Sequence, residues 1–380
     1  MDFRIPFNRP CLAGNEYKYI AEAIANGQAS GDGPFTRRCH ELLEREFQAP
    51  KVLLTTSCTH ALEMAAILLD CGPGDEIIIP SFTFVSTANA FALRGARVVF
   101  ADIRSDTLNL DESRLQSLIT KRTKAIVPVH YAGVACEMDA ICGIAREHGV
   151  RVVEDNAHGL FARYKGKLTG TFGCLSTQSF HETKNIICGE GGAVVVNDPE
   201  MVERAMIIRE KGTNRSQFFR GQVDKYTWVD IGSSYLPSDL LAAFLLAQLE
   251  GRQEIQSKRR RLWEYYWRHL QGVAQENNNV RLPVIPPECE QAYHMFYLIL
   301  PSLECRQALI EHLKQNGILS VFHYVPLHLS AMGKKFGIRE CPVTEDLSSR
   351  LLRLPFYNDL TEDDQAQVVG LLKDFFNVRD

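Results

Sequence analysis

The chain alternates between short runs of Val, Ile and Leu and longer stretches in which apolar residues recur every three or four positions. The short runs cover residues 51–55, 76–79, 98–101, 125–129, 151–154, 175–180 and 193–196. The helix-like stretches between them include residues 59–69, 137–148 and 201–210. Strands that alternate with helices are typical of a mostly parallel sheet covered by helices on both faces. The pattern therefore predicts an α/β fold with a seven-stranded sheet.

The pattern changes after Ser238. Residues 238–270 read as one long helix or a bent pair of helices, followed by a strand at 295–300, a helix at 303–315 and a strand at 319–322. A final helix begins at Thr361, with Asp364 three residues later in a capping-box position. We expect a large domain over residues 1–250 and a smaller α+β domain over residues 251–380, because the chain is too long for one small core.

Composition and charge are ordinary for an enzyme. The chain has 45% hydrophobic and 23% charged residues and a net charge of -4, which argues against nucleic acid as its main partner.

The N-terminal segment Met1–Asn8 has no apolar signal core and no run is long enough to span a bilayer, so we expect a cytoplasmic protein without a membrane partner. Its eleven cysteines include no C-x-x-C pair, and nothing has metal-ligand spacing, so we expect no metal.

A lysine and an aspartate follow two of the predicted strands. Asp155 ends the run that begins at residue 151, and Lys184 follows the run 175–180 within Ser-Phe-His-Glu-Thr-Lys-Asn. Taken singly, the ordinary interpretations are a solvated lysine and an aspartate that caps a helix. In one cavity, however, a lysine amine can form a Schiff base with pyridoxal phosphate while an aspartate keeps the pyridine nitrogen protonated.

Other side chains near the expected strand ends suit the same cofactor. The turn at Cys58 and Thr59 opens a helix, whose N-terminus can bind phosphate, and the Ser179 hydroxyl can add to that site. Phe84 can stack on the ring and His158 can contact its oxygen. The alternatives are a core phenylalanine, which is the common fate of such residues, and a helix-start histidine with a satisfied hydrogen bond. A second group suggests a substrate wall: His323, Tyr324 and His328.

The motifs Val-Glu-Asp-Asn-Ala-His, Ser-Phe-His-Glu-Thr-Lys-Asn and Gly-Glu-Gly-Gly, at these spacings, resemble the DegT/DnrJ/EryC1/StrS sugar-nucleotide aminotransferases. The resemblance extends over nearly the whole chain and implies the aspartate-aminotransferase (type I) fold, pyridoxal 5'-phosphate as cofactor, and a homodimer with active sites at the subunit interface. It implies Lys184 and Asp155 as catalytic residues. It also implies a set of cofactor-binding residues: Cys58, Thr59, Phe84, Asp155, Ala157, His158, Ser179 and Lys184. Ser234 stands where many members have an Asn that reaches the neighbouring subunit's phosphate.

Residues 127–139 and 209–228 are most similar to family members that make dTDP-4-amino-4,6-dideoxygalactose for enterobacterial common antigen, which implies a role in that synthesis or in lipopolysaccharide biosynthesis. The resemblance implies transfer of the amino group of L-glutamate to C4 of dTDP-4-keto-6-deoxy-D-glucose, with Arg215 and Arg220 as candidates for binding the diphosphate or the donor carboxylate. Other interpretations are amination of another 4-keto or a 3-keto sugar nucleotide, a dehydratase of the same fold, which Lys184 disfavours, and a non-catalytic regulator that binds pyridoxal phosphate.

Overall fold

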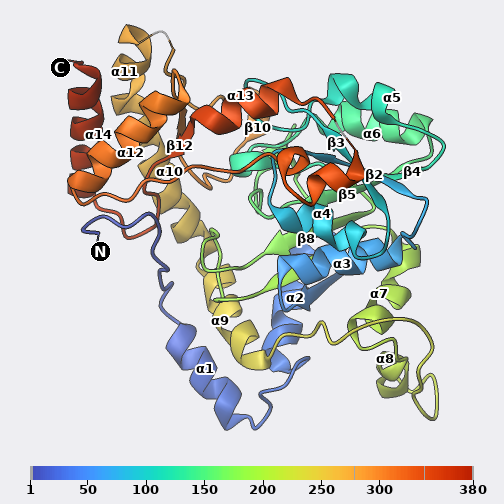
Figure 1. Ribbon diagram of the computed structural model, residues 1–380. Helices are drawn as coiled ribbons and strands as arrows, with labels where there is room; N and C mark the ends of the chain where they lie inside the picture. Colours follow the sequence, from blue (N-terminus) through green and yellow to red (C-terminus); the bar gives the residue numbers. More distant parts are fainter. Residues whose placement is uncertain (1–2, 278, 338, 379–380) are drawn as a thin grey trace.

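The centre of the protein is a seven-stranded sheet, seen in a computed structural model that describes residues 3–277, 279–337 and 339–378 (Figure 1). Residues 1 and 2 of the N-terminal segment lie outside the described residues. The sheet order is β1-β9-β8-β5-β4-β2-β3, and only β9 runs antiparallel to its neighbours. Its strands are β1 (Lys51–Thr55), β2 (Glu76–Pro80), β3 (Arg97–Ala101), β4 (Thr123–Ile126), β5 (Arg151–Asp155), β8 (Leu175–Ser179) and β9 (Gly192–Val196). The predicted fold class is confirmed.

Helices cover both faces of this sheet because alternate strand residues are apolar on each side. One face packs on α3 (Cys58–Leu68), α4 (Val85–Ala92) and α7 (Val202–Arg209). The opposite face packs on α2 (Pro34–Phe47) and α9 (Asp239–Glu250) near β1 and β9, and on α5 (Leu115–Leu118) and α6 (Met138–Glu147) near β4. Helix α1 (Glu16–Ala25) lies against α9, and α8 (Arg215–Phe219) projects at the lower edge in Figure 1.

The C-terminal part has a separate hydrophobic core around Trp263, Tyr266 and Phe296, which also takes in Ile5 from the N-terminal segment. The second of the two interpretations of residues 238–270 is confirmed, because α9 ends at Glu250 and α10 (Arg252–His269) begins beyond Gly251. The boundary at 250/251 stays a proposal. The remaining elements are α11 (Gln271–Glu276), β10 (Cys289–Glu290), β11 (Tyr297–Ile299), α12 (Leu303–Gln315), α13 (Pro342–Arg350), β12 (Leu351–Arg353) and α14 (Glu362–Phe376).

Two predicted strands differ from the structure. The run 125–129 forms β4 only as far as Ile126, because Pro128 has no N–H to continue the ladder, and Val129 makes a single bridge to Asp155. The predicted strand at 319–322 is wrong. Only Val321 pairs, with Arg353, and the chain then turns towards the sheet domain. The partner of β11 is β12, which the sequence analysis did not predict. Two short strands, β6 (Arg163–Tyr164) and β7 (Lys167–Leu168), join β10 in a small second sheet.

Candidate active site

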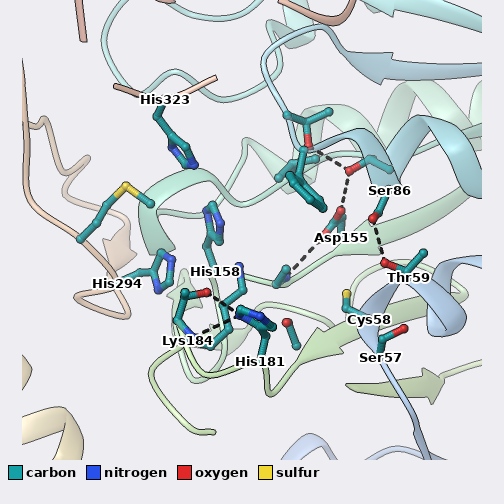
Figure 2. A pocket seen from close by; sticks show the side chains of 18 of the residues that line it. Ser57, Cys58, Thr59, Ser86, Asp155, His158, His181, Lys184, His294 and His323 are labelled. Atoms are coloured by element: carbon teal, nitrogen blue, oxygen red, sulfur yellow. Dashed lines mark hydrogen bonds between the residues drawn. The ribbon is translucent and has the colours of Figure 1, made fainter. Parts of the chain in front are cut away.

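A cavity of about 590 Å³ lies where β5 and β8 end and α3 and α4 begin, and the C-terminal part closes one side of it (Figure 2). The predicted site residues that line it are Cys58, Thr59, Phe84, Asp155, Ala157, His158, Ser179, Lys184, His323 and Tyr324. Ten residues from five separate stretches of sequence therefore meet in one place. The carboxyl end of a mostly parallel sheet is where ligands of such folds bind.

Lys184 lies in the loop that joins β8 to β9. Its backbone N–H donates to the carbonyl of His181 at 2.9 Å, and the loop closes with Cys188 N–H donating to the carbonyl of Phe180 at 2.7 Å. Burial lowers the pKa of the Lys184 amine to about 8, an effect that the neighbouring Cys58 and Asp155 partly oppose. At neutral pH this amine is therefore a far better nucleophile and base than an ordinary lysine.

Asp155 is the last residue of β5 and is 5% exposed. Thr87 donates its hydroxyl to Oδ2 at 2.8 Å, and the N–H of Ala157 donates to Oδ1 at 3.2 Å. Burial raises the pKa of this carboxyl, while the two hydrogen bonds and the Lys184 charge lower it. A buried carboxylate fixed in this way would gain a strong hydrogen bond from a cationic N–H, such as that of a protonated pyridine.

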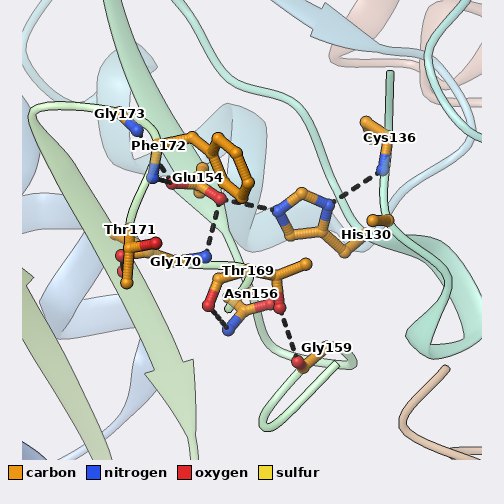
Figure 3. Close-up of polar contacts among 12 residues, drawn as sticks. His130, Cys136, Glu154, Asn156, Gly159, Thr169, Gly170, Thr171, Phe172 and Gly173 are labelled. Carbon is orange, nitrogen blue, oxygen red and sulfur yellow. Dashed lines mark hydrogen bonds and ion pairs between the residues drawn. The ribbon is translucent and has the colours of Figure 1, made fainter. Parts of the chain in front are cut away.

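A buried network behind the site fixes the end of β5 (Figure 3). The Glu154 carboxylate accepts from the N–H groups of Gly170, Phe172 and Gly173 at 2.6–2.8 Å and pairs with His130 Nε2 at 2.9 Å. Because His130 Nδ1 accepts from the N–H of Cys136 at 3.1 Å, Nε2 carries the proton and donates to Glu154. These bonds hold the backbone next to Asp155 in place.

The start of α3 forms a cradle suited to phosphate. The Ser57 side chain caps the helix by accepting from the His60 N–H at 3.1 Å, and Thr59 shares a 2.8 Å hydrogen bond with Ser86. The β9 backbone passes so close that a Cβ on Gly192 would lie 2.4 Å from the Cys58 nitrogen. The first N–H groups of an α-helix have no partner inside the helix, so this end suits an anion.

Aromatic and imidazole rings make the rest of the wall. Phe84 is 57% exposed at the start of α4 and lies 6.3 Å from the ring of Tyr324. His158 stacks on His294 with ring centroids 4.2 Å apart, and His158 Nδ1 is buried without a partner among the described residues. Burial lowers the pKa of His158, His294 and His323 well below the usual histidine value, so these rings are neutral.

The remaining predicted residues lie outside this cavity. Arg215 pairs with Glu210 at 2.8 Å, and Arg220 pairs with Glu203 at 2.8 Å, both on the exposed segment around α8. His328 lies in a short 3-10 helix and hydrogen bonds to Ser81 at 2.6 Å. Ser234 is exposed, near Glu210.

The lining residues that the sequence analysis missed include Ser86, Thr87, His294 and Arg353. Ser86 and Thr87 lie just beyond Phe84, so the prediction that Phe84 lines the site could have been extended to them. His294 and Arg353 lie over a hundred residues beyond Lys184 in the chain. No local sequence pattern indicates that these two residues line the same cavity as the lysine.

A buried lysine amine, an aspartate at the end of a neighbouring strand, and a helix N-terminus suited to phosphate together define a pyridoxal-phosphate-dependent enzyme of the aspartate-aminotransferase fold. The chain belongs to the DegT/DnrJ/EryC1/StrS aminotransferase family, whose profile matches residues 10–373. The protein is therefore an aminotransferase that uses pyridoxal phosphate.

Three similar proteins cover almost the whole chain. The spore coat polysaccharide biosynthesis protein SpsC of Bacillus subtilis is 31% identical, over 97% of this chain and 96% of its own. Helicobacter pylori PseC, an aminotransferase involved in the biosynthesis of pseudoaminic acid, has a TM-score of 0.90 at 27% identity and full coverage of both chains. Streptococcus pneumoniae Spr1654 in its PLP-form has a TM-score of 0.88 at 25% identity, over 99% of this chain and 100% of its own.

In the described part of the chain, no helix is long and apolar enough to cross a membrane. Within the same residues, no group of three or more His, Cys, Asp or Glu side chains is arranged to hold a metal ion.

Proposed function

We propose that this enzyme transfers the amino group of L-glutamate to C4 of dTDP-4-keto-6-deoxy-D-glucose, giving dTDP-4-amino-4,6-dideoxy-D-galactose and 2-oxoglutarate. The observation that carries the proposal is the buried Lys184 amine, which shares one cavity with Asp155. The names of SpsC and PseC support a sugar acceptor. The likeness of residues 127–139 and 209–228 to the galacto-forming branch supports the particular nucleotide sugar.

The residues fit the cofactor, because the α3 cradle, Asp155 and Lys184 match its phosphate, ring nitrogen and aldehyde. Bound pyridoxal phosphate supplies an aldehyde and a cationic ring that accepts the electrons released at the reacting carbon. Asp155 would accept a hydrogen bond from the ring nitrogen and so keep it protonated. Lys184 Nζ removes the α-proton of L-glutamate in the first half-reaction and returns a proton to C4 of the sugar in the second. Delivery to one face of C4 gives the axial amine.

The neutral rings of the wall orient the ligands. Phe84 and Ala157 would pack against the pyridine ring of the bound cofactor, and His158 would hydrogen bond to its oxygen. The buried Nδ1 of His158 supports that role, since it has no partner among the described residues. Ser179 and Thr59 add hydroxyls to the phosphate cradle.

We propose further that the enzyme works in the cytoplasm as a homodimer that supplies enterobacterial common antigen synthesis. The exposed position of Ser234, away from its own cavity, supports a contact with the phosphate in the neighbouring subunit. On this proposal each active site is completed by both chains.

The direct test is the NMR structure of the product after incubation with pyridoxal phosphate, L-glutamate and dTDP-4-keto-6-deoxy-D-glucose. An axial amine at C4 is expected. An equatorial amine at C4 or an amine at C3 would keep the chemistry and overturn the proposed substrate pose. If the cofactor accepts the amino group but no aminated sugar forms, the acceptor is a different nucleotide sugar.

A further inference from the structure

Arg353 is the one guanidinium among the described residues that line the cavity. It is the last residue of β12, and its backbone is fixed on both sides. It pairs with Tyr297 of β11 in register, and its N–H donates to the carbonyl of Val321 at 2.8 Å. Three strand-like segments therefore hold the Arg353 side chain at the cavity wall.

The positive charge of Arg353 has no acidic partner among the described residues. Its Nη2 donates to the carbonyl of Phe322 at 3.0 Å, its guanidinium lies 4.6 Å from the centre of the Phe7 ring, and its Nε is buried without a partner. Burial lowers the pKa of Arg353, which remains charged. A guanidinium with a buried Nε and no described acceptor for it is costly unless an anion completes its hydrogen bonds.

The place of Arg353 in the cavity limits which anion can reach it. Arg353 hydrogen bonds to Phe322, the residue before His323, and His323 lies on the opposite side of the cavity from Ser57, Cys58 and Thr59 in Figure 2. The phosphate cradle therefore occupies the other end. The charge of Arg353 also lowers the pKa values of Lys184, His158 and His323, so it acts within electrostatic range of the reacting amine.

Two acids also line the cavity, and neither neutralises Arg353. Asp155 is held by Thr87 and Ala157, and Glu190 lies 3.6 Å from His181. An anion that binds Arg353 must therefore come with a ligand. Guanidinium groups bind carboxylates and phosphates alike in bidentate geometry. Because the phosphate cradle lies at the other end of the cavity (Figure 2), a carboxylate is the anion that suits this position.

We propose that Arg353 binds a carboxylate of the amino donor and so selects dicarboxylic amino acids for the first half-reaction. This inference rests on the proposed function, with L-glutamate as donor. Arg353 thereby takes the donor-binding role that the sequence analysis offered to Arg215 and Arg220. It leaves the sugar nucleotide to other parts of the site.

The test compares Arg353→Gln with wild-type holoenzyme by calorimetry, using glutarate as the probe. Glutarate has the two carboxylates of L-glutamate but no amine, so it binds without reacting. We expect the substitution to weaken glutarate binding by roughly 10- to 100-fold, the range for loss of a charged hydrogen bond. In steady state the KM for L-glutamate should rise by a similar factor, while the KM for the sugar nucleotide stays the same.

Arg306→Gln is the matched control. Arg306 also lies over an aromatic ring, Phe322 at 5.7 Å, donates to a backbone carbonyl and has a buried Nε without a described partner, but it does not line the cavity. It should leave glutarate binding unchanged.

The inference would be overturned if the wild type and Arg353→Gln bound glutarate equally well. It would also be overturned if the wild type bound no glutarate. If Arg353→Gln instead weakens binding of dTDP, the guanidinium serves a phosphate and the inference is wrong. Because glutarate binding needs no sugar, these results are independent of whether the proposed acceptor is the right one.

Discussion

At the scale of single residues, burial determines the chemistry of the site. Lys184 and Asp155 share one cavity, and burial acts on both by disfavouring the charged form. The lysine therefore becomes a usable base near neutral pH. The aspartate depends on Thr87 and Ala157 for its ionised form.

The lysine leads to a prediction about pH. The Lys184 amine must be neutral to attack an aldehyde, and its pKa is lowered to about 8, so the neutral fraction rises as the pH increases through that value. We expect the rate at which apoenzyme attaches pyridoxal phosphate to rise through about pH 8 and then level off, followed by absorbance after rapid mixing. A rate that keeps rising up to about pH 10, where an ordinary lysine titrates, would contradict this.

Thr87 gives a second prediction. Thr87→Val keeps the shape but removes the hydroxyl that donates to Asp155. The pKa of Asp155 should rise further, and the affinity for pyridoxal phosphate should fall about tenfold, because a hydrogen bond to a charged group is lost. Equilibrium titration of apoenzyme measures this.

Thr344→Val is the control, since Thr344 donates its hydroxyl to another buried carboxylate, Asp102, at 2.8 Å and lies outside the cavity. It should lower stability without changing the cofactor affinity. Equal losses of affinity in the two variants would show that Thr87 acts only through the stability of the fold.

At the scale of elements, the close passage of β9 past α3 shapes the phosphate cradle. A Cβ on Gly192 would also lie 2.4 Å from the Ser57 carbonyl carbon, and backbone cannot move as easily as a side chain. We expect Gly192→Ala to destabilise the protein by about 1–3 kcal/mol and to weaken phosphate binding, measured by thermal unfolding with and without pyridoxal phosphate.

Gly143→Ala is its control, because a Cβ there, inside α6, would meet nothing within 4 Å. That change should be neutral or stabilise the protein by about 0.5–1 kcal/mol. An unchanged melting temperature and cofactor response in Gly192→Ala would show that the start of α3 can shift freely.

Elements with local signals were predictable from the sequence. Helix α12 matches its predicted bounds, and the capping box of Thr361 and Asp364 is present at the start of α14. The strand expected at 319–322 failed because its β-like residues have one pairing position, Val321 with Arg353. Lys184 and Asp155 were found because each follows a strand, whereas Arg353 was assigned no role because its contact with the cavity depends on how the C-terminal part packs.

At the scale of the whole molecule, exposed aromatic residues surround α8. Phe219 is 70% exposed and Trp228 is 76% exposed, on a segment at the edge of the molecule in Figure 1. Large exposed apolar groups of this kind are typical of interaction surfaces. The proposed homodimer would give them a partner.

The dimer predicts a solution mass of twice the 42.9 kDa chain mass, measured by light scattering. Trp228→Ser should weaken the dimer and lower activity at low protein concentration. Trp267→Ser, on α10 and 42% exposed, is the control and should leave both unchanged. A wild type that is monomeric and fully active would rule out a shared active site.

The central claim is that Lys184 makes this cavity an aminotransferase site. The most direct measurement adds L-glutamate alone to the holoenzyme and follows the absorbance of the bound cofactor together with 2-oxoglutarate. We predict that the yellow absorbance of the bound cofactor is lost and that about one 2-oxoglutarate forms per site. Neither change should occur in Lys184→Ala. A yellow protein that binds its cofactor but does not respond to L-glutamate would contradict the account and favour a regulator.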